Sequence, residues 1–269
     1  MGFKILVLDL DGTLTNSKKE ITQHTKDVLF KAMKSGLKVV LASGRPTYGI
    51  MPLAPELHLA EYGGYILSYN GGQILDCSTN NILYENTLHP EVYPFLYDSA
   101  KKNGFEIISY LNEYIISENP DNPYIQHEAF LNKMQCKKVA SFLETINVPV
   151  PKCLIVGEPT SLKDLEQDMK TVLNGKMNVF RSEPFFLELV PNDIDKARSL
   201  EKLLKELNLT ADEMIAIGDG FNDVSMIKYA GLGVAMANAQ DAVKRVADYI
   251  TLSNEEDGVA TVVEKFIMI

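Results

Sequence analysis

Two aspartates, Asp9 and Asp11, stand one residue apart, directly after the apolar run of residues 4–8 and before Gly12. The run predicts a buried strand, and residues two apart in an extended chain point to the same side. Two carboxylates held together at the end of such a strand repel each other and lose hydration, so they need a counter-charge. A divalent cation with oxygen ligands would supply it. A strand followed by an ordinary Asp-Gly turn would account for Asp11 and Gly12 but not for Asp9.

Polar residues also follow the other expected core strands. The apolar runs 37–42 and 214–217 are followed by Ser-Gly-Arg at 43–45 and by Gly-Asp-Gly-Phe-Asn-Asp at 218–223. Because functional groups gather at the carboxyl ends of parallel strands, we expect these segments to meet. Oxygen ligands for Mg²⁺ would come from Asp9, the backbone carbonyl of Asp11 and Asp219, and Asp223 would hold a metal-bound water. Donors for a phosphoryl group would come from backbone amides and from Thr13, Ser43 and Asn222.

A phosphoryl group also needs a fixed cation. The candidate is Lys196, in the first turn of a helix that begins at Asp195, where the helix N-terminus itself favours an anion. Arg45 is expected either to bind the anion or to form an ion pair within its own domain, and both interpretations stay open. Asn70 precedes a glycine, which favours a turn-shaping role over a role in the site. His127 is interpreted as a packed histidine rather than a substrate contact.

A parallel sheet would position these residues. Strand 4–8, a helix at 22–35 and strand 37–42 form a βαβ unit, which predicts parallel pairing. Beyond about residue 85, short aromatic-rich strands alternate with helices, as in an α+β domain, and the α/β pattern resumes near Pro191. The fold class is therefore α/β: a Rossmann-like core with a parallel sheet and helices on both faces, plus an inserted α+β domain.

The composition excludes several classes of partner. The chain has 269 residues, a formal net charge of −10 and a pI near 5.0, which argue against nucleic acid and against an anionic membrane surface. The three cysteines are an odd number without paired spacing, so they predict reduced thiols rather than a disulfide framework or a zinc cluster. The sequence has no signal-peptide pattern and no apolar run long enough for a membrane span, so we expect a cytoplasmic protein.

Four segments resemble, in order, the four motifs of the haloacid dehalogenase-like (HAD) superfamily. They are Asp9-Leu10-Asp11-Gly12-Thr13-Leu14, Ala42-Ser43-Gly44-Arg45-Pro46, Lys196, and Gly218-Asp219-Gly220-Phe221-Asn222-Asp223. The insertion between the second and third motifs resembles the large α/β cap of the Cof-type sugar-phosphatase branch. The resemblance covers nearly the whole chain and implies a catalytic core at 1–85 and 190–269 with a substrate-specificity cap at 86–189. Around Lys196 the chain departs from the branch, because Asp193 and Asp195 precede the lysine.

The resemblance implies a Mg²⁺-dependent phosphatase that acts on small phosphorylated metabolites, most often sugar phosphates. Asp9 would be the nucleophile that forms an aspartyl-phosphate, Asp11 the general acid and base, and Lys196 the third catalytic residue. The residues implied for the metal are Asp9, Asp11, Asp219 and Asp223, and those implied for the substrate are Ser43, Gly44, Arg45, Asn222 and Lys196.

Two other functions remain open. A phosphomutase would use the same carboxylates but return the phosphoryl group to a sugar. A catalytically idle module on the same fold would only bind a metabolite or a protein. In each case the expected partner is not a nucleic acid or a membrane, and the sequence predicts neither the individual substrate nor the oligomeric state.

Overall fold

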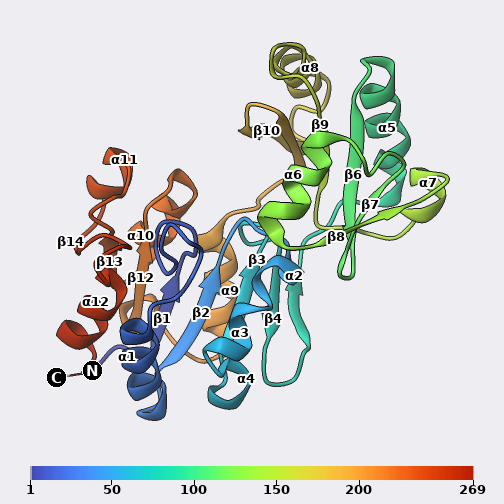
Figure 1. Cartoon of the computed structure of the whole chain (residues 1–269). Helices are drawn as coiled ribbons and strands as arrows, with labels where there is room; N and C mark the ends of the chain where they lie inside the picture. The colour runs from blue at the N-terminus through green and yellow to red at the C-terminus, as the bar shows by residue number, and fades with distance from the viewer. Residues whose placement is uncertain (1, 269) are drawn as a thin grey trace. The chain divides into compact units, whose positions relative to one another are not determined.

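The computed structural model describes residues 2–268, which fall into two compact units (Figure 1). The core unit runs to Tyr84 and resumes at Asp195, and the inserted unit is Glu85–Ile194. The core unit is therefore built from both ends of the chain. The assignment of one unit to catalysis and the other to substrate selection stays a prediction.

The core unit is organised around one eight-stranded sheet with β1 (Ile5–Leu8) near its middle. Neighbouring strands from β14 (Tyr249–Ile250) to β3 (Tyr65–Ser68) pair in parallel, as predicted, whereas β4 (Gln73–Asp76) is antiparallel to β3 and extends the sheet beyond the expected strands. All four residues of β1 are buried, because helices cover both faces of the sheet. In spatial order the other strands are β14 (Tyr249–Ile250), β13 (Leu232–Ala235), β12 (Met214–Gly218), then β2 (Lys38–Ala42), β3 (Tyr65–Ser68), β4 (Gln73–Asp76) and β5 (Ile82–Glu85).

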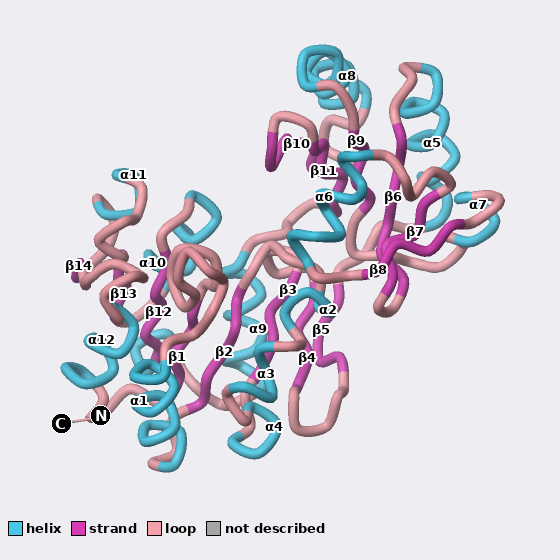
Figure 2. The backbone as a smooth tube through the Cα atoms, in the orientation of Figure 1, coloured by secondary structure: helices cyan, strands magenta, loops and turns pink. Residues whose placement is uncertain are grey.

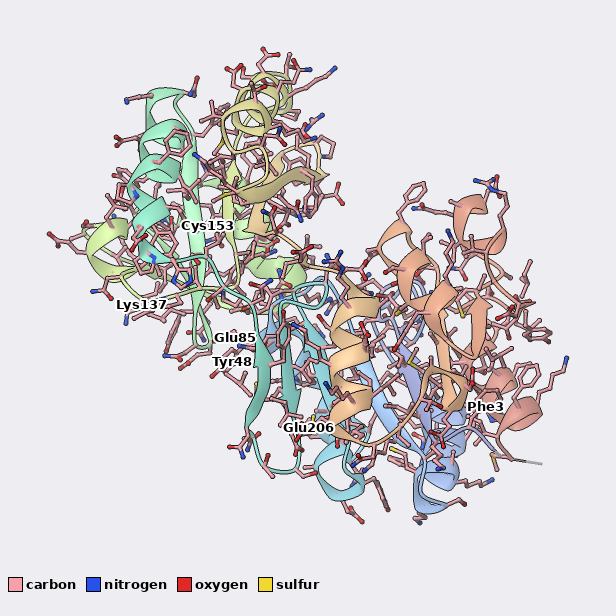
Figure 3. The ribbon with its side chains drawn as sticks, turned by 180° about the vertical axis from the view of Figure 1, so that it is seen from behind. Phe3, Tyr48, Glu85, Lys137, Cys153 and Glu206 are labelled. Atoms are coloured by element: carbon pink, nitrogen blue, oxygen red, sulfur yellow. The ribbon has the colours of Figure 1, made fainter. Side chains whose placement is uncertain are left out.

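The helices of the core unit lie on both faces of this sheet. Helix α1 (Gln23–Lys34) lies in front of the sheet in Figure 1. Helix α9 (Lys196–Glu206) lies in front of the sheet in Figure 3, which shows the opposite side and labels Glu206 at the end of this helix. The longer helices are α1 (Gln23–Lys34), α9 (Lys196–Glu206), α10 (Val224–Tyr229) and α12 (Gly258–Phe266). The short ones are α2 (Thr47–Ile50), α3 (Leu53–Glu56), α4 (Leu59–Tyr62), α11 (Asp241–Lys244) and the 3₁₀ turns η2 (Ala211–Glu213) and η3 (Phe221–Asp223).

The inserted unit has a six-stranded mixed sheet. Its strands, in spatial order, are β10 (Met177–Glu183), β11 (Phe186–Pro191), β9 (Cys153–Val156), β6 (Glu106–Leu111), β7 (Tyr114–Ser117) and β8 (Gln135–Lys138). Its helices are α5 (Tyr93–Lys102, after the 3₁₀ turn η1, Pro90–Val92), α6 (Pro123–Asn132), α7 (Phe142–Thr145) and α8 (Pro159–Val172). Apolar side chains of α5, α7 and α8 pack with the sheet in one core.

Local signals predicted the main helices well. Helix α1 begins after Thr22, whose side chain accepts a hydrogen bond from the Thr25 amide at 3.2 Å, and the capping box at Thr210 and Glu213 is present. Helix α6 was not predicted, because its apolar residues do not gather on one face of the helix. The edge strand β8 was also missed, since its sequence Gln-Cys-Lys-Lys is polar and largely exposed.

The described part of the chain holds three cysteines, none of them in a disulfide. Cys77, Cys136 and Cys153 are all free thiols in the structure, so the absence of a disulfide framework is confirmed for the described residues. No helix among residues 2–268 combines the length and the apolar character that a membrane crossing requires.

Candidate active site

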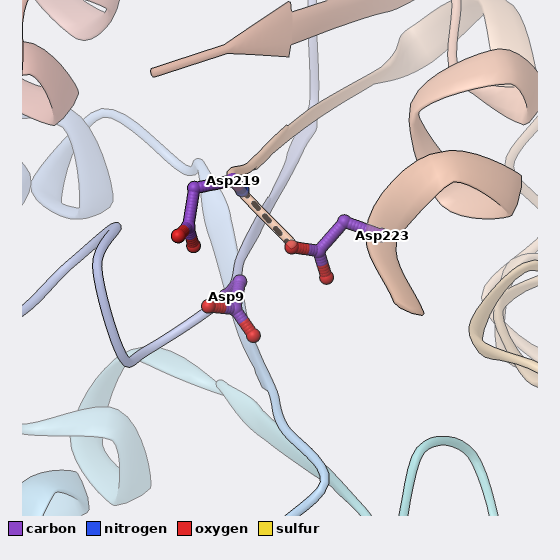
Figure 4. A group of neighbouring side chains, drawn as sticks. All are labelled: Asp9, Asp219 and Asp223. Atoms are coloured by element: carbon purple, nitrogen blue, oxygen red, sulfur yellow. Dashed lines mark hydrogen bonds between the residues drawn. The ribbon is translucent and has the colours of Figure 1, made fainter. Parts of the chain in front are cut away.

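Three aspartates meet at the carboxyl end of the core sheet (Figure 4). Oxygens of Asp9, Asp219 and Asp223 lie within 4.8 Å of one another. Strands β1 and β12 pair in parallel with Leu8 opposite Ile217, so the residues that follow the two strands emerge side by side. Figure 2 shows the strands passing into loops at this edge. The predicted meeting of the first and fourth sequence motifs is thus seen in the structure.

The turn after β1 brings the chain close to Asp219. Gly12 has φ of +85°, and a Cβ atom at this position would lie 2.5 Å from Oδ2 of Asp219. Only glycine accommodates both the left-handed backbone and this approach. The next residue, Thr13, donates its hydroxyl to Oδ1 of Asp219 at 3.0 Å. Thr13 therefore orients a carboxylate of the cluster, where the sequence suggested a donor to a phosphoryl group.

Asp223 organises the loop after β12. Its Oδ2 accepts the backbone amides of Asp219 at 3.0 Å and Gly220 at 2.9 Å, the first of which is drawn in Figure 4. The side chain is fully buried, so these bonds replace the water that a carboxylate would otherwise need. Asp223 thereby fixes the backbone that presents Asp219.

Lys196 supplies the fixed cation of the cluster. Its Nζ donates to Oδ1 of Asp9 at 2.8 Å, to Oδ1 of Asp223 at 2.6 Å and to the carbonyl of Ala42 at 2.9 Å. The residue is 1% exposed. Burial alone would lower the pKa of Lys196, but Asp223 and Asp9 outweigh burial and hold the pKa well above its ordinary value. The side chain is therefore a permanent ammonium ion between two carboxylates.

The cluster still carries an excess of negative charge. Burial raises the pKa of Asp9 well above its usual range, Asp223 and Asp219 raise it further, and Lys196 offsets only part of this. With all three carboxylates ionised, the one ammonium would leave two negative charges uncompensated within a small volume, which the raised pKa of Asp9 reflects. A hard divalent cation with oxygen ligands fits this donor set and this charge.

The side chain of Asp11 does not join this cluster. Its Oδ2 accepts Nε of Arg45 at 2.8 Å, and its Oδ1 accepts Nη2 of Arg45 and Nζ of Lys19, each at 2.6 Å. Burial alone would raise the pKa of Asp11, but the two cations outweigh burial and lower it. Of the two interpretations of Arg45, the ion pair within its own domain is the one present in this structure. Lys19 was not singled out in the sequence, because nothing in Ser-Lys-Lys-Glu distinguishes it from Lys18.

The predicted phosphoryl-binding residues gather beside the cluster. Asn222 donates Nδ2 to Oδ1 of Asn70 at 2.9 Å, and the amide of Asn70 donates to the carbonyl of Ser43 at 2.9 Å. A Cβ at Gly44 would lie 3.0 Å from Nδ2 of Asn70. Asn70 has φ of 56°, so it shapes its turn, as expected, and it also connects the loops after β2 and β12.

The acidic residue before Lys196 has a local role. Asp195 is the N-cap of α9, and its Oδ1 accepts the amide of Arg198 at 3.1 Å. This carboxylate is thus engaged at the helix terminus, while Lys196 bonds to Asp9 and Asp223. The predicted position of Lys196 in the first turn of the helix is confirmed.

Comparison with known proteins identifies the family. The family model for haloacid dehalogenase-like hydrolases matches residues 6–263. The chain is 30% identical to the putative phosphatase YxeH of Bacillus subtilis, with 99% of each chain covered. It is 31% identical to 5-amino-6-(5-phospho-D-ribitylamino)uracil phosphatase YcsE of the same organism, over 100% of this chain and 97% of the relative.

A solved structure agrees with these sequence matches. A haloacid dehalogenase-like hydrolase from Bacteroides thetaiotaomicron superimposes with a TM-score of 0.95 at 56% identity, covering 98% of this chain and 99% of that one. The four motifs, their meeting at one edge of the sheet and these matches lead to one conclusion. The chain belongs to the haloacid dehalogenase-like hydrolases, as a Cof-type phosphatase of that superfamily.

Proposed function

We propose that this protein is a Mg²⁺-dependent phosphatase that hydrolyses small phosphorylated metabolites through an aspartyl-phosphate on Asp9. The observation that carries the proposal is the environment of Asp9. This buried carboxylate lies within 4.8 Å of Asp219 and Asp223 and is held by Lys196 at 2.8 Å. An attacking carboxylate needs both a fixed orientation and compensation of its charge, and this arrangement supports both.

In the proposed reaction Asp9 attacks phosphorus in line, and the bond from phosphorus to the leaving oxygen breaks. Asp11 donates a proton to that oxygen and later takes a proton from the water that cleaves the aspartyl-phosphate. Lys196 keeps the Asp9 carboxylate in place. A Mg²⁺ ion held by Asp9, Asp219, Asp223 and the backbone carbonyl of Asp11 would reduce the repulsion between two anionic reactants.

Donors around the cluster would bind the transferred phosphoryl group. We assign this role to Ser43, Gly44, Asn222 and Lys196, whereas Arg45, the fifth residue predicted for it, is paired with Asp11. The hydrogen bond between Asn222 and Asn70 supports the assignment, because it fixes the amide of Asn222 before a substrate arrives.

The preferred substrates are sugar phosphates, and we assign their selection to the inserted unit. One relative at 31% identity is named for a phosphate ester on a ribityl chain, which supports a polyol or sugar leaving group. Within the inserted unit, Tyr124 stacks on Phe185 with ring centroids 5.4 Å apart, and His127 meets the edge of the same ring at 5.5 Å. His127 is nevertheless exposed, so these ring contacts lie at the surface of the unit and do not confirm the packed-histidine interpretation.

The direct test is an assay of the purified protein on p-nitrophenyl phosphate and on a panel of sugar phosphates, with Mg²⁺ and with a chelator. We expect inorganic phosphate to be released when the ester is the only phosphorylated compound present. We also expect the chelator to stop this release. Transfer of phosphate between sugar positions would instead indicate a mutase. Absence of turnover on every ester, with Mg²⁺ present, would reject the proposal in favour of a binding module.

A further inference from the structure

Two cations from different segments hold the Asp11 carboxylate. Arg45, in the loop after β2, donates Nε to Oδ2 at 2.8 Å and Nη2 to Oδ1 at 2.6 Å. Lys19, in the segment between β1 and α1, donates Nζ to Oδ1 at 2.6 Å. Rotation of the carboxyl group would break these bonds, so its orientation is set by both residues together.

The turn that presents Lys19 is closed by hydrogen bonds of its own. Oδ1 of Asn16 accepts the amides of Lys18 and Glu20, both at 3.0 Å. The backbone carbonyl of Asn16 accepts the amide of Lys19 at 2.9 Å, and the amide of Asn16 donates to the backbone carbonyl of Glu20 at 3.0 Å. The ammonium of Lys19 therefore reaches Asp11 from a structured turn.

The same turn is fastened to the C-terminal part of the core unit. The amide of Ser17 donates to Oε1 of Glu255 at 2.6 Å. The side chain of Asn254 donates to the carbonyl of Thr15 at 2.9 Å. These contacts bridge more than two hundred positions of sequence and fix the turn relative to the loop that carries Asp11.

Stability does not account for a lysine at this position. The side chains of Lys19 and Asp11 are 47% and 37% exposed, and such an ion pair contributes little to folding. Lys19 also has φ of 61°, a backbone that glycine or asparagine adopts at lower cost. The ammonium group, rather than the backbone, is what a lysine brings to the turn.

The two oxygens of Asp11 accept different numbers of hydrogen bonds, and the difference is due to the ammonium of Lys19. Oδ1 accepts two hydrogen bonds and Oδ2 accepts one. Oδ1 is therefore held from two segments of the chain, by Lys19 and by Nη2 of Arg45, so Lys19 adds a constraint on the carboxyl group that Arg45 alone does not give.

This inference rests on the proposed function, in which Asp11 is the general acid and base. We propose that Lys19 is a positioning residue that keeps the Asp11 carboxyl group directed at the leaving-group oxygen. The proton moves from Asp11 to that oxygen as the old bond to phosphorus breaks and the bond from Asp9 forms, and Lys19 acts through its hydrogen bond to Asp11. General acid catalysis requires hydrogen-bond reach, which is what the orientation secures.

The test compares two classes of ester in one protein. A p-nitrophenolate leaves without a proton, whereas the alkoxide of an alkyl phosphate such as glycerol phosphate needs one. In Lys19→Gly we expect kcat/KM to fall about tenfold on the alkyl ester and to change less than about twofold on the aryl ester. Lys19→Arg should restore the alkyl rate, and Lys18→Ala, which removes a neighbouring charge, should leave both rates unchanged.

Glycine suits the backbone at position 19, so the melting temperature of Lys19→Gly should not fall. Lys19→Asn, which also suits this backbone, serves as the second variant. An equal loss on both esters would mean that Lys19 attracts phosphates generally, and an unchanged or higher alkyl rate would mean that it does not position the acid. Either result overturns the inference while the proposed function stands. A wild-type protein that hydrolyses neither ester overturns the proposed function and the inference with it.

Discussion

The Nζ of Lys196 lies 2.8 Å from Oδ1 of Asp9, although the two residues are 187 positions apart in the chain. The same nitrogen bonds to Oδ1 of Asp223 at 2.6 Å. Without this ammonium, two buried carboxylates would face each other across a short distance. Lys196 therefore maintains the cluster, in addition to the role in substrate binding that we propose for it.

Replacing Lys196 by methionine should damage both stability and turnover. Breaking a buried ion pair by removing one partner costs about 3–5 kcal/mol. Loss of one preorganised electrostatic group should reduce kcat by about 100-fold or more. Steady-state kinetics and urea unfolding, each with and without Mg²⁺, measure the two effects, and we expect Mg²⁺ to recover part of the stability.

Lys205→Met is the matched control for this change, since Lys205 is an exposed residue in the last turn of the same helix. It should leave both kcat and the unfolding free energy close to wild type. Wild-type turnover in Lys196→Met would show that the buried ammonium is not needed for the reaction.

Alanine substitutions at Gly12 and Gly36 separate the effect of backbone strain from the effect of a steric clash with Asp219. Both have positive φ, at +85° and +98°, so alanine at either position costs on the order of 1 kcal/mol of backbone strain. A Cβ at Gly36 would meet nothing within 4 Å, whereas a Cβ at Gly12 would lie 2.5 Å from Oδ2 of Asp219. We expect Gly12→Ala to lose Mg²⁺-dependent activity by about 100-fold, while Gly36→Ala keeps kcat. Equal kcat values in the two variants would contradict a role for Asp219.

A buried ion pair in the inserted unit predicts a dependence of stability on pH. Nζ of Lys152 lies 3.0 Å from Oε2 of Glu188, and Lys152 is 5% exposed. Burial alone would lower the pKa of Lys152, but Glu188 and Glu128 outweigh burial and raise it. A lysine whose pKa is raised on folding contributes its full stability below the unfolded pKa of about 10.4. That contribution to stability is lost as the pH rises through the pKa that Lys152 has in the folded protein.

Lys152→Met should therefore lower the unfolding free energy by about 3–5 kcal/mol near neutral pH, because it leaves the carboxylate of Glu188 unpaired. The difference in unfolding free energy between Lys152→Met and the wild-type protein should become smaller at alkaline pH, above about 10.4. Urea unfolding at a series of pH values measures it, with the exposed Lys163→Met as control. A difference that stays constant over the alkaline range would show that Lys152 does not titrate in this way.

Much of the core unit was predictable because its signals are local. The apolar run before Asp9, the Thr22 cap of α1 and the position of Lys196 at the start of α9 are each set by neighbouring residues. Parallel pairing of the strands then brings their ends together, which is why Asp9 and Asp219 could be expected to meet.

What could not be predicted depends on contacts between distant segments. The position of Lys19 beside Asp11 requires the turn at Asn16 and its attachment to Glu255, and the sequence carries no local sign of that pairing. The bond between Asn70 and Asn222 likewise joins two loops that are adjacent only in the folded sheet. In the inserted unit, α6 has no apolar stripe, so tertiary packing rather than its own pattern determines it.

The proposed mechanism depends most directly on Asp9 as the attacking group. The decisive measurement is mass spectrometry of the protein after acid quenching during turnover of a phosphate ester with Mg²⁺. We predict a phosphoryl adduct on Asp9 in the wild-type protein, and neither adduct nor turnover in a folded Asp9→Asn variant. Turnover by Asp9→Asn at the wild-type rate, or a phosphoryl group found on a different residue, would contradict the account.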